Sequence, residues 1–154
     1  MAAESTPGGD ALRELLDRVV DALDLEATVE VVEDDERVTG ALDGDDLGLF
    51  IGRHGQTIDA VQHLAFKVAA QGESPAPRVE VDAAGYRDRR RQALERQAEQ
   101  AAADAVRTGR PTALDSMSAN ERKVVHEYLK DRDDVETYSE GTEPDRHLVV
   151  APLN

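Results

Sequence analysis

The sequence predicts an α+β protein built from two small modules that share a long helix. Segments with apolar residues at helical spacing alternate with short β-branched segments along the 154 residues. The texture changes at Tyr86, where an Ala- and Arg-rich stretch begins and continues to about Arg107. The chain has no Cys or Trp and only 3% aromatic residues, so Ala, Val, Leu and Ile must fill both cores.

The first module is expected to begin with a flexible leader over residues 1–9 and a helix that starts at Asp10. Asp is a favoured N-cap, and the apolar residues that follow recur at helical spacing. These residues are Leu12, Leu15, Leu16, Val19, Val20 and Leu23. Two strands are predicted next, over residues 27–32 and 37–42, and the acidic run 33–36 joins them as a hairpin.

The rest of the first module contains two more helical segments and a strand. Residues 45–51 are short and apolar with acids at their start, which is typical of a helical turn or two. Gly52-Arg-His-Gly55 follows, and then a helix over about residues 56–71, which Gly72 ends. The alternating segment 78–82 predicts a third strand.

The second module is predicted to open with the long helix, which Gly109 and Pro111 stop. Ser118 and Glu121 have the spacing of a capping box, so another helix is expected from there to about Lys130. Three strands are expected in this module, over residues 112–114, 135–138 and 147–150.

Composition excludes several classes of protein. Without Cys there are no disulfides, thiol chemistry or Cys-based zinc sites. No apolar run is long enough to span a membrane, and the N-terminus lacks the features of a secretory signal. We therefore expect a cytoplasmic protein. The four His residues show no metal spacing, and a calcium loop starting at Asp43 fails because Leu47 and His54 stand at ligand positions. No metal or cofactor is predicted.

The net charge of −15 argues against nucleic acid as a partner, because phosphate contacts need Lys and Arg. The charge is unevenly distributed, however. Residues 1–50 carry −12, whereas residues 51–72 carry +1 and residues 83–110 carry +3. The two least acidic stretches hold the most informative motifs, and a local field can override the net charge.

Gly52 and Gly55 flank two basic residues between two predicted helices. Glycines let a backbone approach a ligand closely, and the N–H groups at the start of the helix from Gln56 attract phosphate. Arg53 supplies a fixed charge and His54 a titratable one. The alternative is a turn that needs glycine for conformation alone. A floor for nucleotide bases is expected from Leu49, Phe50, Ile51 and Ile58.

The stretch Leu49-Phe-Ile-Gly-Arg-His-Gly-Gln-Thr-Ile-Asp-Ala-Val-Gln-His-Leu64 resembles the signature of a KH domain and is similar to that of the bacterial Jag/KhpB family, also called SpoIIIJ-associated proteins. The resemblance implies a type II KH domain over residues 10–84. In KH domains this loop clamps the backbone of about four nucleotides while a groove reads the bases. Carried over to this sequence, the clamp consists of Gly52, Arg53, His54 and Gly55.

Arg122 and His126 stand four residues apart in the helix after the capping box, so they share one face, with Lys123 beside them. A guanidinium and an imidazole one turn apart can grip neighbouring phosphates of a flexible strand; the alternative is an ordinary surface pair. The stretch from Pro111 to His126 resembles the Arg-x-x-x-His domain that binds single-stranded nucleic acid, here over residues 85–152. In the family, this domain directly follows the KH domain, as it does here.

Further phosphate contacts are predicted from a basic cluster at the start of the long helix; the alternative is a solvated helix face. The cluster comprises Arg87, Arg89, Arg90 and Arg91. Cations near a helix N-terminus are unfavourable for the helix dipole, which favours a functional role.

These features predict a bacterial RNA-binding protein that is not an enzyme. The resemblance implies post-transcriptional control, a link to cell-envelope or division physiology (cell shape and cell-wall organisation), and a small separate KH protein as a partner. Two alternatives stay open. One is an acidic interaction adaptor, with a chaperone-like association with the membrane insertase and incidental RNA binding. The other is a hydrolase that uses the abundant carboxylates.

Overall fold

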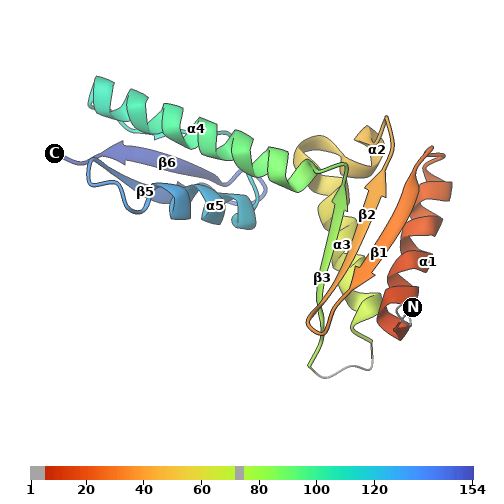
Figure 1. Cartoon of the computed structure of the whole chain (residues 1–154). Helices are drawn as coiled ribbons and strands as arrows, with labels where there is room; N and C mark the ends of the chain where they lie inside the picture. The colour runs from red at the N-terminus through yellow and green to blue at the C-terminus, as the bar shows by residue number, and fades with distance from the viewer. Residues whose placement is uncertain (1–5, 72–74) are drawn as a thin grey trace. The chain divides into compact units, whose positions relative to one another are not determined.

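The structure is a computed structural model and describes residues 6–71 and 75–154. Figure 1 shows two compact units, Met1–Arg87 and Asp88–Asn154, each with its own three-stranded sheet and helices. The predicted α+β class with two small modules is confirmed. Among the described residues, no helix combines the length and apolar character needed to cross a bilayer.

Helix α1 (Pro7–Ala22) begins earlier than the predicted Asp10. Thr6 is the N-cap, because its Oγ1 accepts a hydrogen bond from the Gly9 N–H at 3.2 Å, and Pro7 suits the first helical turn. Asp10 lies instead within that first turn, where a carboxylate complements the helix dipole. The predicted leader over residues 1–9 is therefore helical at its end, and its first five residues lie outside the described residues.

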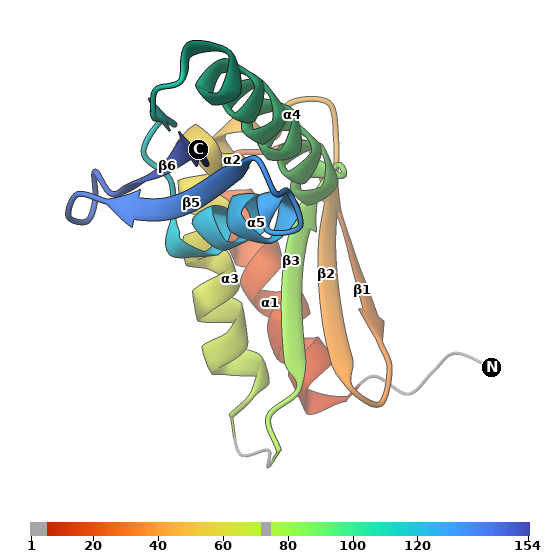
Figure 2. The same cartoon turned by 90° about the vertical axis from the view of Figure 1, so that its left-hand side faces the viewer.

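The sheet of the first unit has the order β1-β2-β3. Strands β1 (Thr28–Glu33) and β2 (Arg37–Asp43) are antiparallel, whereas β2 and β3 (Arg78–Ala83) are parallel. Helices α1 and α3 (Gln56–Ala69) lie on one face of this sheet (Figures 1 and 2). The short α2 (Gly48–Ile51) and a 3-10 turn, η1 (Arg53–Gly55), precede α3. The fully buried side chains include Leu12, Leu16, Leu42, Phe50, Ile58 and Val81.

The second unit has an antiparallel sheet of order β4-β6-β5. Its elements are α4 (Tyr86–Thr108), which begins in the first unit, and then β4 (Thr112–Ala113), α5 (Ala119–Leu129), β5 (Val135–Glu140) and β6 (His147–Pro152). Leu148 and Val150 lie on one face of β6 and share a core with Val125 of α5 and a row of buried alanines on α4. Both helices therefore cover the same face of the sheet. The alanines are Ala98, Ala101, Ala102 and Ala105.

Candidate nucleic-acid interface

The loop between α2 and α3 requires glycine at both of its predicted positions. Gly52 and Gly55 have φ values of +72° and +79°, a region that favours glycine. A Cβ atom on Gly52 would lie 2.3 Å from Thr57 Oγ1, and one on Gly55 would lie 2.7 Å from Tyr86 Oη. The loop is therefore closely packed on its inner side, and substituting either glycine would force it to move.

The side chains of Arg53 and His54 are exposed at the tip of this loop. Within the two described stretches of chain, neither makes a hydrogen bond or an ion pair. No side chain caps α3, which follows directly, so the loop combines two uncommitted bases with the N–H groups of a helix start. This arrangement can accept an anion without breaking any contact of Arg53 or His54.

The predicted floor for bases is corrected in part. Phe50 and Ile58 are fully buried in the core of the first unit, where no ligand reaches them. Leu49 is 66% exposed, and Ile51 is partly buried. Hydrophobic residues at successive positions of a short helix cannot all face one side, because each turns by about 100° from the last.

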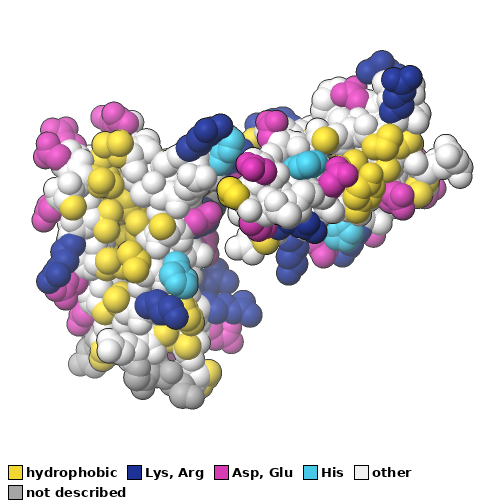
Figure 3. Space-filling view, turned by 180° about the vertical axis from the view of Figure 1, so that it is seen from behind, with side chains coloured by type: hydrophobic (Ala, Val, Ile, Leu, Met, Phe, Trp, Pro, Cys, Tyr) yellow, Lys and Arg dark blue, Asp and Glu magenta, His cyan; other side chains and the backbone are white. Residues whose placement is uncertain are grey.

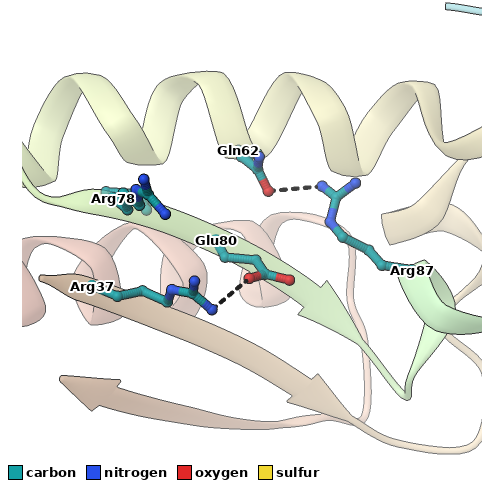
Figure 4. A pocket seen from close by; sticks show the side chains of 6 residues that line it. Arg37, Gln62, Arg78, Glu80 and Arg87 are labelled. Carbon is teal, nitrogen blue, oxygen red and sulfur yellow. Dashed lines mark hydrogen bonds and ion pairs between the residues drawn. The ribbon is translucent and has the colours of Figure 1, made fainter. Parts of the chain in front are cut away.

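An open groove of about 410 Å³ lies beside β3 in the same unit (Figure 4). Its lining residues are Arg37, Gln62, Arg78, Val79, Glu80 and Arg87. Arg37 and Arg78 are register partners on the parallel strands β2 and β3, so their side chains leave the same face of the sheet. Arg37 is 3.7 Å from Glu80, a partly exposed pair. The lining thus carries three cations and one carboxylate in a half of the chain that is strongly acidic.

Helix α5 buries one predicted site residue and exposes the other two. Ser118 caps the helix, because its Oγ accepts a hydrogen bond from the Glu121 N–H. The side chain of Arg122 is only 9% exposed: its Nη1 donates to the Met117 carbonyl at 2.7 Å, and its Nη2 donates to the Glu143 carboxylate at 2.7 Å. The expectation that Arg122 and His126 project together into solvent is therefore wrong for Arg122.

His126 and Lys123 are exposed on α5. The Nδ1 atom of His126 lies within hydrogen-bond distance of Thr137 Oγ1 on β5, which fixes the orientation of the ring. Glu127, the next residue, keeps its negative charge over a wider pH range because a hydrogen bond from Lys130 lowers its pKa. His126 therefore has one ring nitrogen directed to the protein and the other available to a ligand.

Two family models match the chain. The KH domain of KhpA/KhpB matches residues 9–81, and the Arg-x-x-x-His domain matches residues 92–152. The chain is also similar to proteins named RNA-binding protein KhpB from three bacteria. It is 36% identical to that of Clostridium symbiosum over 92% of this chain, and 36% identical to that of Lactiplantibacillus plantarum over 98%. The protein of Bacillus subtilis is 30% identical over 88% of this chain.

The chain belongs to the KhpB family. It spans 65%, 48% and 66% of the lengths of these three relatives. The Gly52–Gly55 loop falls in the KH module, and the α5 helix with Arg122 and His126 falls in the Arg-x-x-x-His module.

The basic cluster at the start of α4 is mostly engaged with protein groups. Arg87 donates hydrogen bonds to Asp59, Gln62 and the Val81 carbonyl, all within the KH module. In the Arg-x-x-x-His module, Arg90 pairs with Glu121, and Arg91 pairs with the neighbouring Asp88. Arg89 is exposed. Phosphate contacts from Arg87, Arg90 or Arg91 would each have to replace one of these contacts.

Sequence reasoning missed two groups of residues near the predicted sites. Arg37 and Arg78 line the groove of the KH module, but only the parallel register of β2 and β3 places them side by side, and that register is not visible locally. Thr137 and Glu143 contact His126 and Arg122 in the second module from the β5–β6 hairpin. Their polar, hairpin-like sequence signalled a surface turn rather than a contact to α5.

Proposed function

We propose that the chain holds single-stranded RNA through the Gly52–Gly55 loop of the KH module and the α5 helix of the Arg-x-x-x-His module, and carries out no reaction on it. The observation that supports the proposal best is the exposure of Arg53 and His54, without protein partners in the described chain, at the uncapped start of α3. The names of the relatives, RNA-binding protein KhpB, agree with it.

In the KH module, one phosphate would lie against the loop, where Arg53 donates charge-assisted hydrogen bonds and the first N–H groups of α3 face the ligand. The glycines keep the loop free of Cβ atoms at the point of approach. The adjoining bases would then enter the groove lined by Gln62, Val79 and Glu80, whose polar and apolar groups face a nucleotide's edge and plane.

In the Arg-x-x-x-His module, Lys123 and the free ring nitrogen of His126 would contact the backbone of the same kind of strand. They lie in successive turns of α5, so they address phosphates that are close together. A single strand can bend its backbone onto such a short surface, whereas a duplex is stiff over this length. Preference for single-stranded RNA follows from this geometry.

The net charge of −15 shapes how the RNA would bind. Acidic side chains are spread over both units on the face shown in Figure 3, and the cations form small separate groups. Such a surface repels RNA at long range and attracts it only at the contacts themselves. We therefore expect modest affinity that falls steeply as the salt concentration rises.

The biological role that we propose is post-transcriptional control in the cytoplasm, linked to cell-envelope or division physiology. The name of the matching KH model, KhpA/KhpB, supports a small separate KH protein as the partner in this role. Purification of the tagged chain from bacteria, with crosslinking and sequencing of its RNA, would identify the transcripts.

A titration of the purified chain with labelled single-stranded and duplex RNA of the same sequence, at two salt concentrations, tests the binding itself. The proposal expects the single strand to bind more tightly and both affinities to fall with salt. Equal affinity for both ligands, or no salt dependence, would contradict it.

A second candidate function is an adaptor for a basic protein, such as a segment of the membrane insertase. It is favoured by α1, whose outer face exposes Asp10, Glu14, Asp17 and Asp21. Replacing Asp17 and Asp21 with Asn separates the two functions. Loss of a protein partner with RNA binding unchanged supports the adaptor, and the reverse pattern, with Arg53 replaced, supports RNA binding.

A further inference from the structure

Arg122 uses its two terminal nitrogens in different ways. Nη1 donates to the carbonyls of Met117 and Arg146, at 2.7 and 3.5 Å, which are neutral main-chain groups on either side of the helix. Nη2 donates to the carboxylate of Glu143. One nitrogen therefore holds the module together, and the other holds an anion.

That anion is presented at the surface. The Glu143 side chain is 59% exposed, whereas that of Arg122 is 9% exposed. Glu143 also lies beyond the last register pair of the hairpin, Glu140 with His147, so it belongs to the connecting loop and not to the β5–β6 ladder. Its side chain can turn away from Arg122 without breaking a sheet hydrogen bond.

A guanidinium binds carboxylate and phosphate oxygens with the same planar, charge-assisted geometry. Because so little of Arg122 is exposed, a phosphate can reach Nη2 only from the side that Glu143 covers. We propose that the Glu143 carboxylate occupies, in the free protein, the position that an RNA phosphate takes on Arg122. The inference rests on the proposed function, because it assumes that the Arg-x-x-x-His module binds RNA.

Two consequences follow for binding. Contact between RNA and Arg122 requires an exchange of one anion for another, so the gain is smaller than for an open arginine. Glu143 also acts as a selectivity residue, because a ligand that offers only weak acceptors cannot displace a charged carboxylate. A phosphate with its neighbours already held by Lys123 and His126 can displace it.

The test compares three single variants of the full chain in a fluorescence-anisotropy titration with labelled single-stranded oligouridine. Glu143→Gln removes the charge, and Glu143→Asp keeps it but shortens the side chain so that it no longer reaches Arg122. Asp145→Asn is the matched control: it removes one charge from the same exposed loop, at a side chain that does not contact Arg122 in the described structure. Thermal unfolding of each variant verifies the fold.

Both Glu143 variants should bind the oligouridine about two- to fivefold more tightly than wild type, the range expected for releasing a partly exposed ion pair. Asp145→Asn should change the affinity less than either. The inference is overturned if Asp145→Asn matches Glu143→Gln while Glu143→Asp stays at the wild-type value, since loop charge alone then explains the effect. Wild-type affinity in both Glu143 variants overturns it too. If wild type itself does not bind, the proposed function has failed instead.

Discussion

The carboxylate of Glu121 accepts hydrogen bonds from Nε and Nη2 of Arg90, at 2.7 and 3.4 Å, and so joins α5 to α4 inside the Arg-x-x-x-His module. The two side chains are only 14% and 20% exposed. Glu121 has the sequence position of a capping-box residue, which normally reaches back to the N–H of the cap. Here only the Ser118 half of the box forms, and the glutamate connects two helices.

We predict that Glu121→Gln lowers the free energy of unfolding of the Arg-x-x-x-His module by about 1.5–3 kcal/mol, the usual contribution of hydrogen bonds to charged groups. Urea denaturation followed by circular dichroism measures this. Glu127→Gln is the control, because its pair with Lys130 is half exposed and should contribute less than about 1 kcal/mol. Equal losses in the two variants would show that burial of the Arg90 pair is unimportant.

The KH loop should lose RNA affinity without losing stability. Replacing Arg53 and His54 together by Asp places two negative charges where phosphate enters, and neither residue supports another part of the described structure. Each lost charge-assisted hydrogen bond weakens binding by about 1.5–3 kcal/mol. Filter binding to single-stranded RNA should therefore show at least tenfold weaker affinity, about 1.4 kcal/mol, with an unchanged melting temperature. An unchanged affinity in the folded double variant contradicts a role for this loop.

Arg122 and His126 should respond differently to alanine. Arg122→Ala removes the donor to buried carbonyls and leaves Glu143 without its partner, so we expect a loss of about 1–3 kcal/mol in stability. His126→Ala combined with Lys123→Ala should leave stability near wild type and weaken binding of single-stranded RNA, with a smaller salt dependence. If the His126 and Lys123 variant binds normally, α5 serves only as scaffold.

Asp34 should make the β1–β2 hairpin sensitive to acid. Its carboxylate accepts hydrogen bonds from the Glu36 and Arg37 N–H groups, which lowers its pKa from the usual 3.8. A carboxyl whose pKa is lower in the folded state stabilises the fold above its unfolded value and loses this contribution as the pH falls through the folded value. Asp34→Asn should therefore flatten the stability profile below about pH 4. The comparison is thermal unfolding of both proteins from pH 6 to pH 3, and parallel profiles would contradict the prediction.

Local patterns predicted the elements well because each carries its own signals. The helical stripe of α1 and the two-residue alternation of β3 depend on neighbours in sequence, and both appear where expected. Side-chain surroundings were harder to predict. Tyr128 was expected in the core, yet it is 43% exposed and donates to Glu99 of α4, and His63 was expected to be half buried but is exposed. The burial of Arg122 depends on a hairpin that closes later in the chain.

The outer edge of β3 has a consequence for the behaviour of the protein at high concentration. An edge strand offers unpaired N–H and C=O groups to which another chain can add as a further strand. At Val81 both groups are already taken, because its N–H donates to Gln62 and its carbonyl accepts from Nε of Arg87. The middle of this edge is therefore closed to intermolecular β-pairing. The two side chains that frame the groove also protect the KH module against self-association into aggregates.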